Sequence, residues 1–166
     1  MFIRRLLRSD APPAPPLRFI LSSFLGATIA IAITGGLSAL SGVPWLMAPF
    51  GASCVLAIGL PDSPLAQPRA IVGGHLVSTM IGLAAGALLG DGWMVCALAV
   101  GLALAAMQLT RTVHAPAGAD PLVVIMAHAP VSYLVAPVLA GSLVIVFSAW
   151  CVNNLRTARS YPRYWI

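Results

Sequence analysis

The sequence predicts an all-α fold: a polytopic transmembrane helical bundle of two inverted three-helix repeats, with a broken short helix in each. Composition predicts the membrane bundle, since 60% of the 166 residues are hydrophobic and 8% are charged. A soluble domain normally carries about a quarter charged residues, whereas this chain has no Lys and no Glu. A repeated element rich in Pro and Gly predicts the two halves. Because charged residues are so few, lipid is the expected solvent for most of the surface.

The formal charge of +5 does not indicate nucleic-acid binding, because the nine Arg residues form no basic stripe with interleaved aromatic residues. We expect membrane lipids, and no nucleic acid, as partners. The three Cys residues are far apart, and the sequence has no Cys-x-x-Cys or His-x-x-x-His pair. It therefore predicts no metal site and no cofactor.

Four apolar stretches approach the roughly 20 helical residues that cross about 30 Å of hydrocarbon. They are residues 19–40, 70–89, 93–109 and 134–152. Two shorter apolar stretches, 45–60 and 121–133, each follow a Pro- and Gly-containing element that breaks or delays a helix. We expect these two to be discontinuous helices.

The Arg residues indicate how often the chain crosses the membrane, because Lys and Arg concentrate in short cytoplasmic loops. Six crossings place all nine Arg residues on the cytoplasmic side, whereas four crossings leave Arg69 and Arg111 outside. We expect six, with both termini cytoplasmic, in the inner (plasma) membrane of a bacterium. Re-entrant short segments are the alternative.

The expected organisation is a basic, Pro-rich cytoplasmic segment (1–18), one transmembrane domain (19–153) and a cytoplasmic tail (154–166). Within the domain, residues 49–53 and 116–120 share a Pro-x-Gly-Ala pattern at an offset of 67 residues. The repeats would span about 19–90 and 92–153. Three crossings in each make the halves antiparallel, as in many transporters that hold substrate near the membrane midplane.

Small residues recur at helical spacing and predict faces for close helix packing, one of which would serve a homo-oligomer. The two rows are Gly82, Gly86 and Gly90, and Ala97, Gly101 and Ala105.

The two repeated elements are the predicted substrate-binding site. Pro49 fits the first turn of a helix that covers only about 18 Å, so this helix begins deep in the membrane. Amide N–H groups at such a start need a partner, and the helix dipole favours an anion. The predicted shell comprises Pro49, Phe50, Gly51, Ala52 and Ser53 from the first element, and Pro116, Ala117, Gly118 and Ala119 from the second.

Residues 47–74, with Pro49-Phe50-Gly51-Ala52-Ser53 and Ser63-Pro64-Leu65-Ala66-Gln67-Pro68-Arg69, followed by His75, resemble the HPP family of integral membrane proteins. The name-giving His-Pro-Pro-Ala-Gly-Ala motif of that family falls on residues 114–119, where Ala115 replaces the first Pro. The resemblance implies an anion transporter, since members are implicated in nitrite transport. Such proteins are usually described with four spans, whereas the Arg positions predict six. We therefore expect a transporter or channel for a small monovalent anion, most readily nitrite.

Ionisable residues inside spans are functional candidates by default. His75, His114 and Asp120 are predicted to couple protons or to orient the site, the alternatives being a packing role for His75 and a helix N-cap for Asp120. Gln67, Arg69 and Arg111 flank the broken segments and are predicted to form a vestibule that attracts anions, or to anchor the topology.

The alternative function is a membrane-embedded enzyme or metal protein, or a non-transporting accessory protein. No Ser-His-acid motif and no phosphate-binding loop is visible in the sequence. We therefore expect a protein that is not an enzyme.

Overall fold

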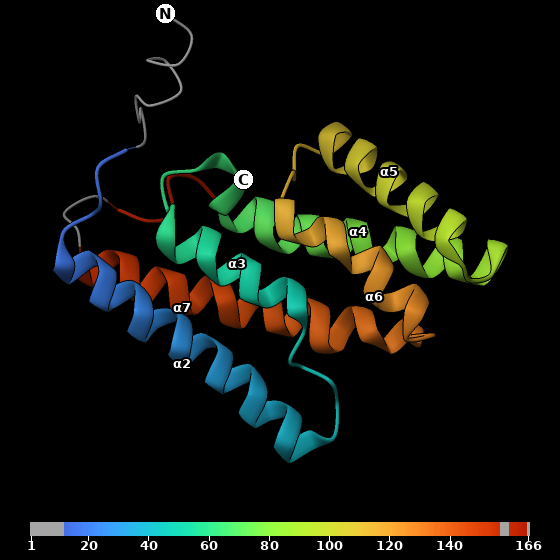
Figure 1. The fold of residues 1–166 in the computed structure, drawn as a ribbon, viewed down its shortest axis with the longest axis horizontal. Helices are drawn as coiled ribbons and strands as arrows, with labels where there is room; N and C mark the ends of the chain where they lie inside the picture. The colour runs from blue at the N-terminus through green and yellow to red at the C-terminus, as the bar shows by residue number, and fades with distance from the viewer. Residues whose placement is uncertain (1–11, 157–159, 166) are drawn as a thin grey trace, which may run out of the picture.

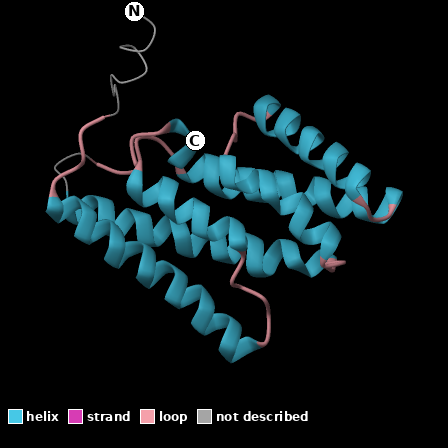
Figure 2. Cartoon of the chain, in the orientation of Figure 1, coloured by secondary structure: helices cyan, strands magenta, loops and turns pink. Residues whose placement is uncertain are grey.

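The computed structural model describes residues 12–156 and 160–165, and this part of the chain consists of helices joined by loops (Figures 1 and 2). The all-α prediction is confirmed. Predictions for Arg4, Arg5, Arg8 and Arg159, for most of the segment 1–18 and for part of the tail 154–166 lie outside the described residues.

Within residues 12–156, six α-helices carry the fold, and successive ones run in opposite directions along the bundle (Figure 1). They are α2 (Leu17–Ser41), α3 (Ala48–Gly59), α4 (Pro68–Leu89), α5 (Trp93–Leu109), α6 (Asp120–Met126) and α7 (Ala140–Arg156). Short tight turns complete it: the 3-10 helices η1 (Pro64–Ala66), η2 (Ala115–Ala119) and η3 (Val131–Leu134), and the π-helical turn η4 (Val135–Leu139).

Three helical stretches of the described chain are long and apolar enough to cross a membrane: Leu17–Ser41, Pro68–Leu89 and Val131–Arg156. Three shorter apolar helices accompany them: Ala48–Gly59, Trp93–Leu109 and Ala115–Met126. The predicted helices 19–40, 70–89 and 93–109 are confirmed within a few residues, and so is a short helix that begins at Pro49. The inverted relation between the halves stays a prediction.

The second broken helix differs from its predicted range of 121–133. It begins at Ala115 as a 3-10 turn, continues into α6 and ends at Met126. Proline lacks a backbone N–H and fits a first helical turn, so Pro116 and Pro121 permit a start at each of these positions. The chain then leaves the helix at His128, whose φ of 46° lies in the left-handed region.

The last span also departs from a regular α-helix near its start. It opens with η3 and η4, and Ala136 inside η4 has extended torsion angles (φ −136°, ψ 118°). The next residue, Pro137, has no N–H to donate and its ring clashes with the preceding turn of an α-helix. The predicted helix 134–152 therefore becomes a broken entry followed by α7.

Small buried residues let the helices approach closely on one side while large apolar residues face outward. On α2 the buried positions Gly26, Ala30 and Thr34 are spaced four apart and so share one face. Leu21 and Phe24 on the same helix are more than half exposed. Only 17% of the apolar window of α2 is buried inside the protein, as expected for a helix in contact with lipid.

The described Arg residues gather at one end of the bundle. Arg18 lies in the first turn of α2. Arg156 ends α7, and its guanidinium lies 3.8 Å from the centre of the Phe19 ring. At the same end Arg69 donates to the carbonyl of Thr110 (2.9 Å). The bundle thus has an arginine end, formed by the starts of α2 and α4 and the ends of α3, α5 and α7 (Figure 1).

Arg156 ties three helices together at the arginine end, and its loss should destabilise the bundle. It donates to the carbonyl of Ile58 in the last turn of α3 and to the hydroxyl of Ser23 in α2 (2.8 Å). Hydrogen bonds from charged groups contribute about 1.5–3 kcal/mol. Arg156→Met should therefore lower the midpoint of thermal unfolding in detergent by about 3–10 °C. Exposed Arg18→Met is the matched control, and equal midpoints for the two variants would contradict this role.

Candidate functional site

A network of polar side chains lies inside the otherwise apolar bundle, where α3, α4 and η2 meet. Its centre is Ser53, which projects from the second turn of α3. The Ser53 hydroxyl oxygen lies 2.9 Å from Nε2 of His75 on α4 and 2.9 Å from Nε2 of His114, the residue before η2. It also lies 3.0 Å from the carbonyl oxygen of Pro49 in its own helix. Pro49 starts α3 at its first turn, so this start fixes where the hydroxyl points.

Each histidine is held from its other ring nitrogen. Nδ1 of His75 lies 2.7 Å from Oδ2 of Asp120, the first residue of α6. Nδ1 of His114 lies 2.7 Å from the carbonyl oxygen of Leu65 in η1. The alternative role of Asp120 as an N-cap is wrong, because its carboxylate makes no capping bond to the helix and bonds the imidazole instead.

Two polar residues on α4 complete the network and were not singled out from the sequence. The Ser78 hydroxyl donates to the carbonyl of Ala117 (2.6 Å), and the Thr79 hydroxyl lies 3.4 Å from Oδ2 of Asp120. Both follow His75 at helical spacing, three and four residues later, and therefore share its face. A polar stripe of this spacing on a transmembrane helix is the signal that could have identified them.

The network is shielded from the surface of the bundle, since Ser53, His75, His114 and Asp120 all have an exposed fraction of 0%. The ring of Phe50 packs edge-on against His75, with 5.3 Å between centroids. Burial of so many polar groups is costly unless they are paired. Oδ1 of Asp120 nevertheless has no hydrogen-bond partner among the described residues.

The order of contacts Ser53–His75–Asp120 is that of a hydrolytic triad: hydroxyl to Nε2, and Nδ1 to carboxylate. No such motif is visible in the sequence, because these residues lie 22 and 45 positions apart in the chain and come together only in the fold. The same chain of contacts can also move a proton between Asp120 and His114.

The predicted anion shell divides into a buried and an open part. Pro49, Phe50, Pro116 and Ala117 are buried, whereas Gly51 and Ala52 are exposed and Gly118 and Ala119 are half-buried. Two N–H groups of this shell already have carbonyl partners: the Phe50 N–H donates to the carbonyl of Met47 (3.0 Å), and the Ala117 N–H donates to that of His114 (3.0 Å). A Cβ atom built on Gly51 or Gly118 would meet no atom within 4 Å. Open space therefore adjoins the backbone at both glycines.

The predicted vestibule residues lie at the arginine end, where Gln67 and Arg69 bond backbone groups. Gln67 is buried, donates to the carbonyls of Pro61 and Ser63 (2.9 Å each) and accepts from the N–H of Arg163 (2.8 Å). Arg69 is half-buried and its Nε has no hydrogen-bond partner among the described residues.

Arg111 is exposed and adopts a φ of 57°. The amide group of Gln67 is thus used within the fold, whereas the side chain of Arg111 is open to the surroundings.

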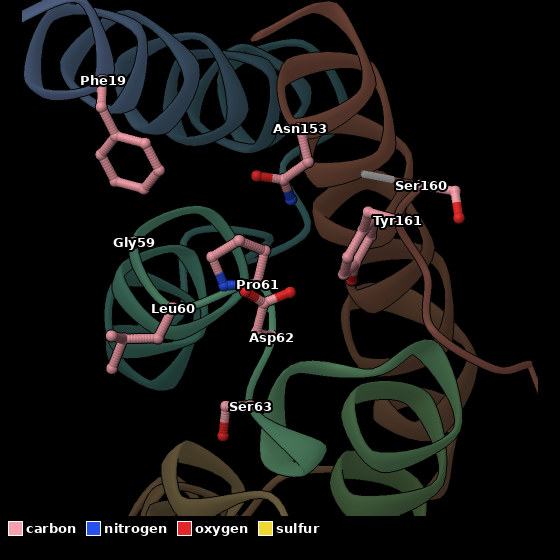
Figure 3. Close-up of a pocket in the computed structure, with 9 residues that line it drawn as sticks. All are labelled: Phe19, Gly59, Leu60, Pro61, Asp62, Ser63, Asn153, Ser160 and Tyr161. Carbon is pink, nitrogen blue, oxygen red and sulfur yellow. The ribbon is translucent and has the colours of Figure 1, made fainter. Parts of the chain in front are cut away.

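A cavity of about 310 Å³ opens at the arginine end, beside the last turn of α3. Figure 3 shows Phe19, Asn153 and Tyr161 around it, with Asp62 on the loop that follows α3. The Tyr161 hydroxyl donates to the carbonyl of Ala66 (2.8 Å), and burial raises the pKa of this phenol, so the donor persists at neutral pH. The cavity lies at the arginine end, and Ser53 is six residues before Gly59, which lines it.

A second cavity, of about 730 Å³, lies between α5 and α6 and includes Trp93 and Leu122 in its walls. It borders His128 and Asp91, whose side chains are exposed and approach to 3.7 Å. His128 is therefore not a member of the Ser53 network.

Comparisons with known proteins agree with the membrane fold. The family model described as "HPP, transmembrane region" matches residues 12–162. A transmembrane protein of Dictyostelium discoideum is 35% identical over 170 residues, which cover 95% of this chain and 60% of that protein. Another transmembrane protein of the same organism is 37% identical over 153 residues, which cover 87% of this chain and 49% of the relative.

The chain thus spans about half to three fifths of the length of these curated relatives. No solved structure matches it. The family match covers nearly the whole chain, including both broken helices and every residue of the Ser53 network, and the chain therefore belongs to the HPP family of transmembrane proteins.

Proposed function

We propose that this protein is a transporter or channel for a small monovalent anion such as nitrite, which passes where the start of α3 meets η2. The observation that carries the proposal is the buried network around Ser53, placed between these two helix starts. Polar and ionisable groups inside a membrane bundle are costly and mark ion or substrate pathways. The membership in the HPP family is compatible with transport.

The first turn of α3 supports an anion in particular. A helix N-terminus carries about half a positive charge and exposes amide donors. Gly51 in this turn is exposed, and Gly118 of η2 is half-buried with open space next to it. The buried Ser53 hydroxyl and the two imidazoles lie next to this turn. An anion that enters beside Gly51 would therefore approach the positive end of the α3 dipole.

Two surfaces around the site have roles in transport and assembly. Arg69 and Arg111 attract the anion at the arginine end, which we place in the cytoplasm of a bacterial cell together with both termini. The exposed small residues Ala97, Gly101 and Ala105 of α5 are the face proposed for a homo-oligomer. Gly82 is excluded from that role, because it packs against Pro121 inside the chain.

Filling the open space should stop transport without unfolding the protein. The variant Gly51→Val with Gly118→Val adds side chains where no atom lies within 4 Å, so the fold accepts them. We expect nitrite uptake into proteoliposomes to fall at least tenfold, because the anion can no longer approach the backbone.

The matched control is Gly36→Val in α2, which also adds a side chain in open space but far from the network along the chain. It should transport as the wild type does. Equal uptake by the double variant and the wild type, at equal thermal stability, would refute the site.

A second candidate function is hydrolysis, which the triad-like contacts of Ser53, His75 and Asp120 favour. Ser53 is buried, and its hydroxyl also contacts the carbonyl of Pro49, so it is not exposed to a substrate in this conformation. A fluorophosphonate probe separates the two functions. Covalent labelling of Ser53, detected by mass spectrometry, would favour hydrolysis, whereas transport predicts an unlabelled serine.

A further inference from the structure

The contacts of the network determine how many hydrogen atoms it holds. A carbonyl oxygen only accepts, so Nδ1 of His114, 2.7 Å from the carbonyl of Leu65, must carry a hydrogen. Nδ1 of His75 likewise donates to the carboxylate of Asp120. A neutral imidazole has one N–H, and in both rings Nε2 would then be a bare acceptor.

Ser53 cannot satisfy two bare nitrogens. Its oxygen has three close contacts, to the two Nε2 atoms and to the carbonyl of Pro49, but a hydroxyl donates one hydrogen and accepts two. At least one Nε2 must therefore carry a hydrogen. The network holds at least one proton more than two neutral imidazoles and an ionised Asp120.

The first additional proton belongs to the pair of His75 and Asp120. Oδ1 of Asp120 has no partner among the described residues, and the Thr79 hydroxyl is 3.4 Å from Oδ2. A buried carboxylate with so few donors needs a positive charge or a proton beside it. With His75 as an imidazolium, or with Asp120 protonated, the network is electrically neutral.

A second proton has a place on Nε2 of His114. Both Nε2–H groups then donate to Ser53, and the Ser53 hydroxyl donates to the carbonyl of Pro49, so all three contacts are matched. The network then carries one net positive charge. A monovalent anion beside Ser53 neutralises it.

We propose that this network makes the protein an electroneutral symporter, in which one proton on Nε2 of His114 accompanies each anion; the inference rests on the anion transport proposed above. The empty network with one additional proton and the loaded network with two protons and an anion are both neutral. In either state the site can therefore switch from facing one side of the membrane to facing the other without moving net charge through a medium of low dielectric constant.

The proton comes from water on one side, forms an N–H bond with the ring lone pair and returns to water on the other side. No electrons are exchanged. The titratable groups that act on one another here are His75 from α4, His114 before η2, Asp120 from α6 and Tyr133 from η3.

The stoichiometry can be measured on the wild-type protein in proteoliposomes. Nitrite uptake and the change of internal pH are recorded together, with a potassium diffusion potential set by valinomycin and with protein-free vesicles to subtract the leak of nitrous acid. We expect one proton per nitrite, and an uptake rate that an imposed potential leaves unchanged but an inside-alkaline pH gradient increases. Nitrite uptake that follows the potential and carries no protons would overturn the symport and leave anion transport standing. An absence of nitrite uptake would overturn both.

A variant of His114 tests the position of the transported proton. His114→Asn keeps an N–H donor for the carbonyl of Leu65 but offers no nitrogen that takes up a proton. Nitrite flux should become dependent on the potential, and accumulation driven by the pH gradient should be lost. Exposed His128→Asn, next to Asp91, is the matched control and should stay coupled. A His114→Asn protein that still moves one proton per nitrite would assign the proton elsewhere and overturn the proposal.

Discussion

Replacing Gly82 with valine is expected to prevent α4 from packing against α6. A Cβ atom on Gly82 would lie 2.6 Å from Cα of Pro121 and 2.6 Å from a methyl group of Val124. Overpacking a well-packed interior costs about 1–3 kcal/mol when side chains can move aside. Here one neighbour is backbone at the start of α6, so we expect a cost of about 3 kcal/mol or more and loss of the monodisperse peak in size-exclusion chromatography.

Gly86→Val is the matched control, one turn further along the same face of α4. The nearest atom to its Cβ belongs to the side chain of Ile125, at 3.5 Å, which is an ordinary contact. This variant should purify and melt close to the wild type. A Gly82→Val protein as stable as Gly86→Val would show that α4 and α6 do not meet at this crossing.

Replacing Ser53 with alanine should have the second largest effect, because it removes the hydroxyl that joins both imidazoles. The Nε2 atoms of His75 and His114 would lose that partner inside the bundle. A buried polar group left without a partner costs about 1–3 kcal/mol. We therefore expect a lower free energy of unfolding in detergent and at least a tenfold loss of nitrite uptake.

Ser142→Ala separates this effect from the general loss of a buried hydroxyl. Ser142 is equally buried, but its hydroxyl donates to the carbonyl of Leu139 three residues earlier in the chain. Its removal should change stability by less than about 1 kcal/mol and leave uptake intact. Parallel losses in the two variants would indicate that Ser53 acts only in packing.

Local features of the fold could be predicted from the sequence because their causes are local. Apolar length sets the long helices, and a proline fits a first turn, which places the start of α3 near Pro49. The same logic misplaced the second broken helix, because Pro116 and Pro121 are both compatible with a helix start and only tertiary packing decides that both are used.

The site could be predicted only in part, because its contacts join distant segments. His75, His114 and Asp120 stood out as ionisable groups in apolar surroundings. Their bonds through Ser53 cross 22 and 61 residues, and no periodic pattern reports such pairings. Gln67 was predicted to attract anions, but its amide is used by the loop between η1 and α3 and by Arg163.

We propose that a monovalent anion binds between the starts of α3 and η2, next to Ser53. An experimental structure of the protein with bromide, whose anomalous scattering identifies the ion, tests this directly. We expect a bromide peak between Gly51 and Gly118, within hydrogen-bonding distance of the first turn of α3. Bromide found only in the cavity beside Asn153 and Tyr161, with the space at the two glycines closed by protein or lipid, would contradict it.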